Sequence, residues 1–418
     1  MLPLEKPWYK RLLLFALVLG GVGGLLALLF MGITGAGIGF FFGDTGTGWW
    51  AGKWWWIPLT ALGGLIVSFL RKIWKVPENV PSPIKLAHNA WVDPGTAVPW
   101  VIISAISLIA GASLGPFFGL AVMGGGLGSW LGTRLEKQGE QEAKQEYTLS
   151  GMAGTMGAAF TSSLFAAILA SELSPTEKRN YVAAFIPALF AATIGYVVYF
   201  GVTGDTMLGR YELPAYEFRF GHLLIGILLG VLAAFILILF ALIKKLVSSA
   251  FSRISNPLVS GVIGGALVGL LAFALPLTAT SGSSQLTTEL QISATLGTAF
   301  VAAILIAKMF AIALSQSSGF LGGVVFPIIF VGGTAGVLVN SIFPGIPIAL
   351  CVGALLAAVP GAFLGAPVSL ILIAAGTVGL GAAALVPICI SVVTSYLTLA
   401  LVRNYVVGEE KLKAQQAD

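Results

Sequence analysis

Apolar stretches long enough to cross a bilayer recur along this chain from Leu12 to Val402, with few polar interruptions. A spanning helix needs about 20 mostly apolar residues, so the chain has room for many such helices and none for a folded soluble domain. Of its 418 residues, 57% are hydrophobic and only 9% are charged, which excludes a soluble multidomain protein. Because backbone polar groups must be paired inside lipid, we predict an all-α polytopic membrane protein with a single transmembrane domain over residues 1–418.

Positively charged residues beside the first spans and in the tail predict how the chain lies in the membrane. The first apolar stretch, Leu12–Phe30, is too long for the apolar region of a secretory signal, so we expect it to remain as a span. The flanking lysines and arginines are Lys6, Lys10, Arg11, Arg71, Lys72, Lys75, Lys411 and Lys413. By the positive-inside rule we expect a multi-pass protein of the plasma (inner) membrane, with both termini and a short tail at 403–418 in the cytoplasm. These charges explain the net charge of +5 without a nucleic-acid partner.

Two short glycine-proline breaks interrupt apolar segments at corresponding places in the two halves of the chain. They are Leu114-Gly115-Pro116 and the run Gly322–Pro327. Inside a bilayer a broken helix is tolerated only where its freed backbone groups face protein or a water-filled cavity. Each break therefore offers the N-terminus of a half-helix, where unpaired N–H groups and the positive dipole end attract an anion. One break alone is most simply a packing kink, but a matched pair predicts a repeat-built transport site.

Weak internal similarity supports two repeat halves, over residues 11–201 and 216–402. After each break comes a glycine-rich apolar segment, Phe117–Gly132 in the first half and Pro327–Gly336 in the second. Other apolar pieces, such as 152–169, are too short to cross a bilayer upright. We therefore predict tilted, partly re-entrant helices arranged as two repeats rather than an up-and-down bundle.

On these residues the chain resembles the CLC family of chloride channels and transporters. Gly322–Pro327 matches the family's second-half signature, in which two glycines and two hydrophobic residues precede a small or apolar residue and a proline. Ala112–Pro116 matches in part the first-half signature, Gly-Lys/Arg-Glu-Gly-Pro, and Pro77–Pro83 matches faintly a serine-bearing turn before an early short helix. The resemblance extends over roughly the whole apolar region. It indicates a divergent prokaryotic-type member without the family's cytoplasmic regulatory modules.

The resemblance implies a homodimer in the lipid bilayer, in which each subunit has its own pathway built from two inverted repeats. The transported species would be chloride or another small anion such as fluoride or nitrate. The family binds its anion with backbone N–H groups at the two breaks and with the serine of the early turn. At these positions stand Ser82, Ser113, Leu114, Gly115, Val324, Val325 and Phe326. A tyrosine near the C-terminus also contacts the anion in the family, and Tyr405 is the nearest candidate here.

Lys308 and Ser82 each have a second, purely structural interpretation. Lys308 lies in an otherwise apolar segment, where its charge would either attract an anion or satisfy backbone carbonyls or another partner. Ser82 precedes a short helix that its side chain would cap, and capping is compatible with anion contact. Both interpretations of Lys308 stay open at this point.

Leu114 stands where the family carries a glutamate that gates the pathway and moves protons in exchangers. Leucine cannot titrate, so obligatory exchange with protons loses its carrier. The exchangers' second proton-handling glutamate aligns with Leu173, and we interpret the preceding Glu172 as a helix-end carboxylate. We therefore expect channel-like transport uncoupled from protons. The alternatives are an anion/proton antiporter with a non-standard proton route and a non-conducting membrane scaffold.

The histidines and cysteines give no sign of an active site or a metal centre. His88 and His222 are the only histidines, and their separation and polar neighbours fit neither a zinc motif nor a hydrolase motif. Cys351 and Cys389 each lie in an apolar segment, where buried reduced thiols are common. We expect no enzymatic activity, no cofactor and no metal.

Overall fold

The computed structural model describes residues 3–43, 52–77, 79–136, 141–160, 162–173, 181–205 and 211–417, with side chains as far as Asn404. These residues form α-helices and two short 3-10 helices, and no strand. The first half contains α1 (Pro7–Phe42), α2 (Trp56–Ile73), α3 (Pro83–Asn89), α4 (Pro94–Ile109), α5 (Phe117–Leu135), α6 (Gln141–Ala159), α7 (Ser163–Glu172) and α8 (Tyr181–Thr203). The second contains α9 (Gly221–Phe251), α10 (Pro257–Ala274), η1 (Pro276–Thr278), α11 (Ser283–Ile292), η2 (Ser293–Thr295), α12 (Thr298–Ser317), α13 (Val325–Ile342), α14 (Ile348–Leu364), α15 (Pro367–Val378) and α16 (Ala382–Ala417).

The two halves repeat one order of helix lengths. A long first helix, α1 or α9, is followed by a helix of 18 residues, α2 or α10, and then by a short helix of 7 or 10 residues, α3 or α11. Further along, α5 and α13 have 19 and 18 residues, α6 and α14 have 19 and 17, and α7 and α15 have 10 and 12. The prediction of an all-α fold built from two repeats is confirmed. It places α5 and α13, the helices that follow the two breaks, at equivalent positions.

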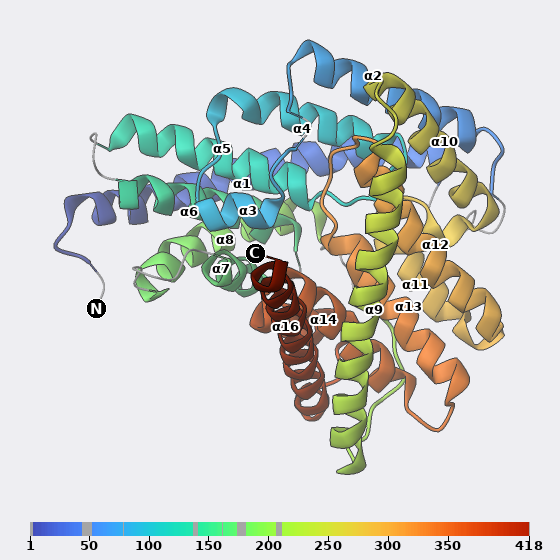
Figure 1. Cartoon of the computed structure of the whole chain (residues 1–418). Helices are drawn as coiled ribbons and strands as arrows, with labels where there is room; N and C mark the ends of the chain where they lie inside the picture. The colour runs from blue at the N-terminus through green and yellow to red at the C-terminus, as the bar shows by residue number, and fades with distance from the viewer. Residues whose placement is uncertain are drawn as a thin grey trace.

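Eight of the described helices are long and apolar enough to cross a membrane: α1, α2, α8, α9, α10, α12, α13 and α16. The apolar helices α4, α7, α14 and α15 have 10 to 17 residues and are too short to cross upright. In Figure 1, α1 and α5 run across the view, while α9 and α16 run steeply. The short segment 152–169 is divided between the end of α6 and α7. Tilted and partial helices are present, as predicted.

Glycines let the spanning helices approach one another closely. A Cβ atom on Gly64 of α2 would lie 1.9 Å from the carbonyl oxygen of Gly261 in α10, and a Cβ on Gly261 would lie 2.4 Å from the oxygen of Gly64. Only glycine at both positions permits this crossing of backbones, which is a frequent way of packing helices in lipid. Gly64 and Gly261 are therefore packing residues between α2 and α10.

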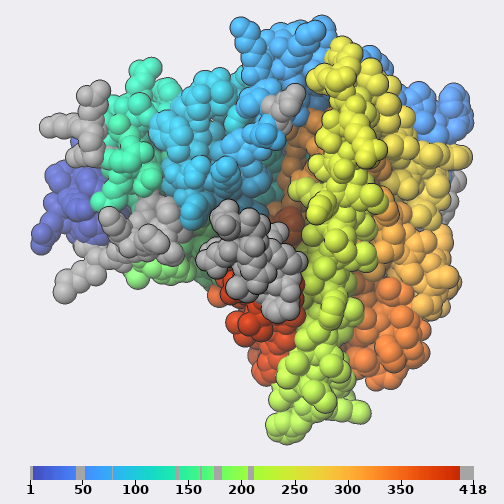
Figure 2. Space-filling model, viewed as in Figure 1, coloured from blue at the N-terminus to red at the C-terminus, as the bar shows by residue number. Residues whose placement is uncertain are grey.

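Apolar side chains on one face of α9 remain uncovered in the single chain. Leu224, Leu228, Phe235, Leu242 and Leu246 are each 60% to 64% exposed. Their spacing of four and seven residues places them along one stripe of the helix. Figure 2 shows α9 as a ridge along the surface of the molecule. Such a stripe on a long helix of a polytopic protein suits contact with lipid tails.

Candidate functional site

The two breaks predicted from the sequence meet in the folded chain. The amide of Gly115 donates to the carbonyl oxygen of Gly323 at 2.6 Å, and the amide of Gly323 donates back to the oxygen of Gly115 at 2.7 Å. These reciprocal bonds form an isolated antiparallel bridge between the segment before α5 and the segment before α13. The breaks therefore form one site, in which two helix N-termini start side by side.

Two serines also link the breaks, because each accepts a hydrogen bond from a backbone amide of the other half. Ser315 of α12 accepts the amide of Ser113 at 3.0 Å, and Ser107 of α4 accepts the amide of Leu321 at 3.1 Å. Each serine hydroxyl also donates to the carbonyl four residues earlier in its own helix, at 2.8 Å in both cases. Ser107 and Ser315 differ by 208 in residue number, as do Ser113 and Leu321. Because the offset is the same on both sides, each break is bonded by the equivalent serine of the other half, as in a local two-fold arrangement.

The turns that lead into the breaks follow the same offset. Gly111 and Gly319 adopt φ angles of +87° and +95°, which favour glycine. Their amides donate to the carbonyl oxygens of Leu108 and Gln316, whose residue numbers also differ by 208. Both halves thus share the pattern Ser-x3-Gly-x3-Gly, at 107–115 and 315–323. The two serines were not among the residues predicted from the sequence, although this shared spacing could have revealed them.

Glycine is required at the breaks because the facing segments are in close contact. A Cβ on Gly322 would lie 2.6 Å from the Cβ of Leu114, and a Cβ on Gly323 would lie 2.5 Å from the Cβ of Phe117. A Cβ on Gly115 would lie 3.0 Å from the Cβ of Phe326. The glycine pair in the second break is therefore required by packing.

Unpaired backbone donors gather at the start of α13. The first backbone bond of this helix is donated by Ile328 to the oxygen of Val324 at 2.9 Å. Within the described parts of the chain, the amides of Val324, Val325 and Phe326 have no acceptor. Val325 and Phe326 are buried, and Val324 is partly buried. Three N–H groups at the positive end of a helix can hold an anion.

The first break offers fewer free donors at the positions expected from the sequence. The amides of Ser113, Leu114 and Gly115 donate to the hydroxyl of Ser315, the oxygen of Ala112 and the oxygen of Gly323 respectively. Unpaired amides occur slightly later, at Phe117, Phe118 and Gly119 in the first turn of α5, where the described residues supply no acceptor. Binding of an anion by the predicted residues stays a prediction.

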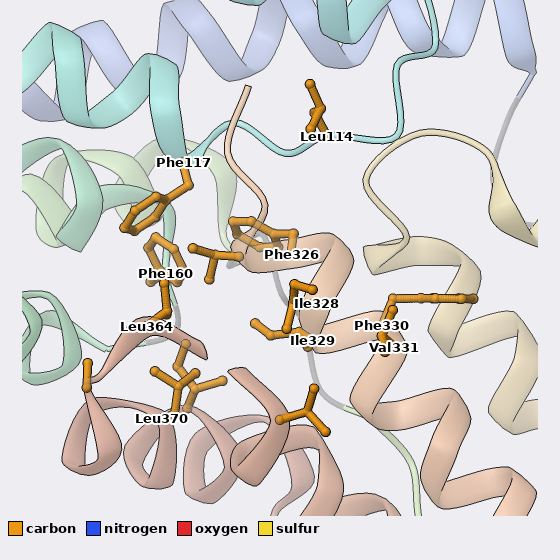
Figure 3. Packing of buried hydrophobic residues seen from close by; sticks show 14 of the residues in the cluster. Leu114, Phe117, Phe160, Phe326, Ile328, Ile329, Phe330, Val331, Leu364 and Leu370 are labelled. Carbon is orange, nitrogen blue, oxygen red and sulfur yellow. The ribbon is translucent and has the colours of Figure 1, made fainter. Parts of the chain in front are cut away.

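Aromatic rings close the space in front of these helix ends. Phe160, which follows α6, stacks on Phe326 of α13 with ring centroids 5.1 Å apart and planes 26° apart. Phe117 of α5 meets the Phe160 ring edge-on at 6.1 Å, and Phe165 of α7 packs on it at 4.6 Å. Figure 3 shows Phe117, Phe160 and Phe326 together, with Leu114 pointing away from them. Phe117 and Phe160 were absent from the predicted site, and a phenylalanine in an apolar segment carries no signal of its own.

The ammonium of Lys308 is bonded to backbone carbonyl oxygens of the protein. Its side chain is fully buried, and its Nζ donates to the carbonyl oxygens of Thr278, Ala279 and Thr280 at 3.0, 3.4 and 2.8 Å. The ammonium also lies 5.1 Å from the centroid of the Phe330 ring. Of the two interpretations given by the sequence, the structure supports the satisfaction of backbone carbonyls.

Ser82 and Tyr405 are not brought to the breaks by any described contact. Ser82 is exposed and caps α3, with its Oγ accepting the amide of Lys85 at 3.3 Å. This is the capping role considered from the sequence. Tyr405 lies in α16, but its side chain is outside the described residues. Anion contact by either residue stays a prediction.

Glu172 forms a cap between the two halves. Its carboxylate ends α7 and accepts the amides of Val368 and Ser369, both at 2.9 Å, and also the hydroxyl of Ser369. Val368 and Ser369 follow Pro367 in the first turn of α15, so the carboxylate satisfies free donors at a helix N-terminus. The interpretation of Glu172 as a helix-end carboxylate fits this geometry.

The part of the chain that the structure describes holds no cluster of three side chains that could bind a metal ion. His222 lies at the start of α9, where its Nδ1 is 2.8 Å from the hydroxyl of Tyr216. Cys351 and Cys389 are both free thiols. The geometry of the breaks is therefore the feature that a functional interpretation must explain.

Comparison with known proteins agrees with the paired breaks. A family model described as voltage gated chloride channel matches residues 63–400, which is most of the chain. The chain belongs to the CLC family. Family membership confirms the resemblance found in the sequence. The chain is a multi-pass membrane protein of an anion-transporting family.

Solved CLC structures share the whole fold. The structure of a slow cyanobacterial Cl−/H+ antiporter superposes with a TM-score of 0.81 at 17% identity, covering 98% of this chain and 99% of that one. The structure of a CLC-type fluoride/proton antiporter gives a TM-score of 0.74 at 20% identity, covering 93% and 95%. At these identities the likeness establishes the CLC fold and leaves the ion and the coupling open.

A curated relative from Methanocaldococcus jannaschii is named an uncharacterized protein. It is 30% identical over 195 residues, which are 46% of this chain and 48% of the relative. The match thus spans about half the length of that relative. The name of this relative gives no information about a substrate.

Proposed function

We propose that this CLC protein carries chloride or another small anion across the membrane without coupling to protons. The observation that carries the proposal is the set of three amides at Val324, Val325 and Phe326, which have no acceptor among the described residues and lie beside the first break. An anion in a low-dielectric medium needs compensating charge, yet a buried full positive charge would hold it too tightly. Partial charges at helix ends meet both requirements.

In this proposal the two breaks have different roles. Val324, Val325 and Phe326 bind the anion through their free amides. Ser113, Leu114 and Gly115 keep the first break against them, because their own amides are engaged with protein acceptors. Ser82, which is exposed, would meet the anion away from the buried pair of breaks.

The stacked rings of Phe160 and Phe326 form a dry constriction next to the free amides. Both side chains are buried, so an anion could not pass them without their displacement. We propose that movement of Phe160 away from Phe326 opens the pathway, as expected of a hydrophobic gate.

Proton coupling is the second candidate, because the solved structures that share the fold are described as proton antiporters. Leu114 argues against it, since a leucine beside the second break can neither bind nor release a proton. An antiporter built from this chain would need a carboxylate elsewhere as its carrier. A non-conducting scaffold, the remaining alternative, gives no reason for three adjacent amides without acceptors, two of them on buried residues.

Flux measurements on purified protein in liposomes separate these candidates. With a potassium ionophore to balance charge, the protein should dissipate a chloride gradient, and substitution of fluoride or nitrate should define the preferred ion. Absence of flux above empty liposomes for every anion tested would leave only the scaffold. Uphill proton movement driven by a chloride gradient would replace the uncoupled proposal with the antiporter.

We further infer that the chain forms a homodimer in the plasma membrane with both termini in the cytoplasm and one pathway in each subunit. Family membership supports association of two subunits within the bilayer. The lysines and arginines near the termini support the orientation. Cysteine labelling from each side of the membrane tests the orientation, and cross-linking in native membrane tests the dimer.

A further inference from the structure

Glu289 is a buried carboxyl group away from the meeting point of the breaks. It lies on α11, a helix of 10 residues that does not span the membrane, and it is fully buried. One oxygen, Oε2, accepts the hydroxyl of Thr334 of α13 at 2.7 Å. The other oxygen, Oε1, has no hydrogen-bond partner. A neutral hydroxyl is weak compensation for a buried negative charge, so the carboxylate form is strongly disfavoured here.

A second unsatisfied acceptor lies one helical turn before Glu289. Gln285 is also buried, and its Nε2 donates to the hydroxyl of Thr280 at 3.0 Å. Its Oε1 has no partner. Residues four apart share a helix face, so two buried acceptor oxygens on one side of α11 lack a donor. A proton on Glu289 would supply the donor that this pair lacks.

The neighbouring elements provide no cation to stabilise a carboxylate at Glu289. Glu289 is the only ionisable residue of α11, and α13, η1 and η2 contain none. Lys308 of α12 bonds to Thr280, which also accepts a hydrogen bond from Gln285 of α11. Its ammonium is bonded to three carbonyl oxygens and forms no ion pair among the described residues. Beyond Glu289, the next residues of α11, Leu290 and Gln291, line a small cavity together with Tyr211 and Glu212, neither of which is a cation.

The titration expected from this environment agrees with the geometry. Burial raises the pKa of Glu289 to about 8, and the hydrogen bond from Thr334 offsets only part of that rise. The side chain therefore changes charge within the pH range in which transport can be measured.

We propose that Glu289 is a proton-binding site that is occupied near neutral pH, and that loss of its proton weakens anion binding at the N-terminus of α13. The inference rests on the proposed anion transport. Thr334 follows Val325 by nine residues on α13. At 1.5 Å per residue the new negative charge would lie about 14 Å from the free amides. At an effective dielectric constant of about 20, that charge lowers anion affinity roughly five- to tenfold.

The chemical step is a simple exchange of a proton with water. The O–H bond of the Glu289 acid breaks, the proton leaves to solvent, and both electrons stay on the carboxylate. The cavity beside α11 is lined by Thr287, Leu290 and Gln291 and not by Glu289, so exchange of this proton with solvent requires local opening around the fully buried side chain. No proton is transferred to the anion, so titration changes the rate of transport and not its coupling.

Anion flux as a function of pH in liposomes tests the proposal with Glu289→Gln. The amide keeps the shape and the bond from Thr334 but cannot ionise. Wild-type flux should fall roughly five- to tenfold between about pH 6 and pH 9, while the variant keeps the higher flux throughout. The control is Glu142→Gln, which removes a half-exposed carboxylate paired with Lys6 and should leave the wild-type profile intact. Parallel profiles for wild type and Glu289→Gln would overturn the inference.

A spectroscopic measurement separates failure of this inference from failure of the proposed function. Infrared difference spectra between neutral and alkaline pH should show loss of a protonated carboxyl band in the wild type. That band should be missing from Glu289→Gln and present in Glu142→Gln. Absence of flux in the wild type at every pH would refute the proposed function, while the infrared band would still decide whether Glu289 binds a proton. No difference between the wild-type and Glu289→Gln spectra would overturn the inference, whatever the flux.

Discussion

Gly115 and Gly323 are joined by two backbone hydrogen bonds that connect the two repeats, with N···O distances of 2.6 and 2.7 Å. Neither residue has a side chain, so the breaks approach closely enough for α5 and α13 to begin next to each other. Ser107 and Ser315 support the arrangement from helices α4 and α12. The helix ends that attract an anion are thus positioned by contacts between the repeats rather than within either one.

Replacing Gly323 by alanine should lower both thermal stability and anion flux. A Cβ at this position would lie 2.5 Å from the Cβ of Phe117 and 2.9 Å from the amide nitrogen of Phe118, so the second break must move away from the first. Overpacking of this kind costs about 1–3 kcal/mol. Melting in detergent and chloride efflux from liposomes measure the two effects. Gly345→Ala is the control, because a Cβ there meets nothing within 4 Å, and equal behaviour of both variants would show that close approach is not required.

Ser107→Ala and Ser315→Ala should destabilise the protein by similar amounts. Each change removes the acceptor of one break amide, that of Leu321 or that of Ser113, and leaves a buried donor unpaired. Such a loss costs about 1–3 kcal/mol. Denaturation in detergent measures the effect, with Ser341→Ala as control because that partly buried hydroxyl bonds only within its own helix. A large effect from one serine and none from the other would contradict the two-fold role.

Phe160→Leu should increase anion flux several-fold if the stacked rings restrict the pathway. Leucine is chosen because truncation of a buried phenylalanine to alanine costs about 3–5 kcal/mol. The shorter side chain removes the ring that stacks on Phe326 at 5.1 Å. Phe165→Leu removes a ring from the same cluster that has no ring contact with Phe326, so its flux should stay near that of the wild type. Equal flux in both variants would argue against a gate at Phe160.

The sequence was sufficient to predict the membrane class, the repeated architecture and the two breaks. Apolar length and glycine-proline interruptions are local properties, and both halves carry them. The direct bridge between Gly115 and Gly323 could not be predicted, because nothing local to either glycine specifies a partner 208 positions away. The same limit applies to Phe160, whose role depends on a ring supplied by α13.

Predicted donors at the first break illustrate a second limit of local analysis. A free amide is expected wherever a helix begins, but whether it stays free depends on side chains from other helices. Ser315 takes the amide of Ser113, while no described acceptor reaches Val325. Lys308 shows the converse, since carbonyls from the η1 turn determine which of its two interpretations holds.

Leu114→Glu should make anion flux depend on pH. Leu114 is buried against Gly322, so a glutamate there would lie beside the second break. As a carboxylate it would compete with the anion for the amides of α13, and as a neutral acid it would not. Flux should therefore fall as pH rises from about pH 5 to pH 8, because burial raises a carboxyl pKa. Leu114→Gln is the control without titration, and an unchanged pH profile in an active Leu114→Glu variant would place this residue outside the pathway.

Glu289→Gln should stabilise the protein selectively in alkaline solution. The pKa of Glu289 is raised from 4.5 to about 8 by burial, so between these values the folded protein holds a proton that the unfolded chain releases. Stability contributed by the protonated group is complete below the lower value and is lost as pH rises to the upper one. Melting in detergent should therefore show little difference between wild type and variant near pH 5, and a higher melting temperature for the variant near pH 9. A constant difference across this range would mean that Glu289 has the same pKa in the folded and unfolded chain.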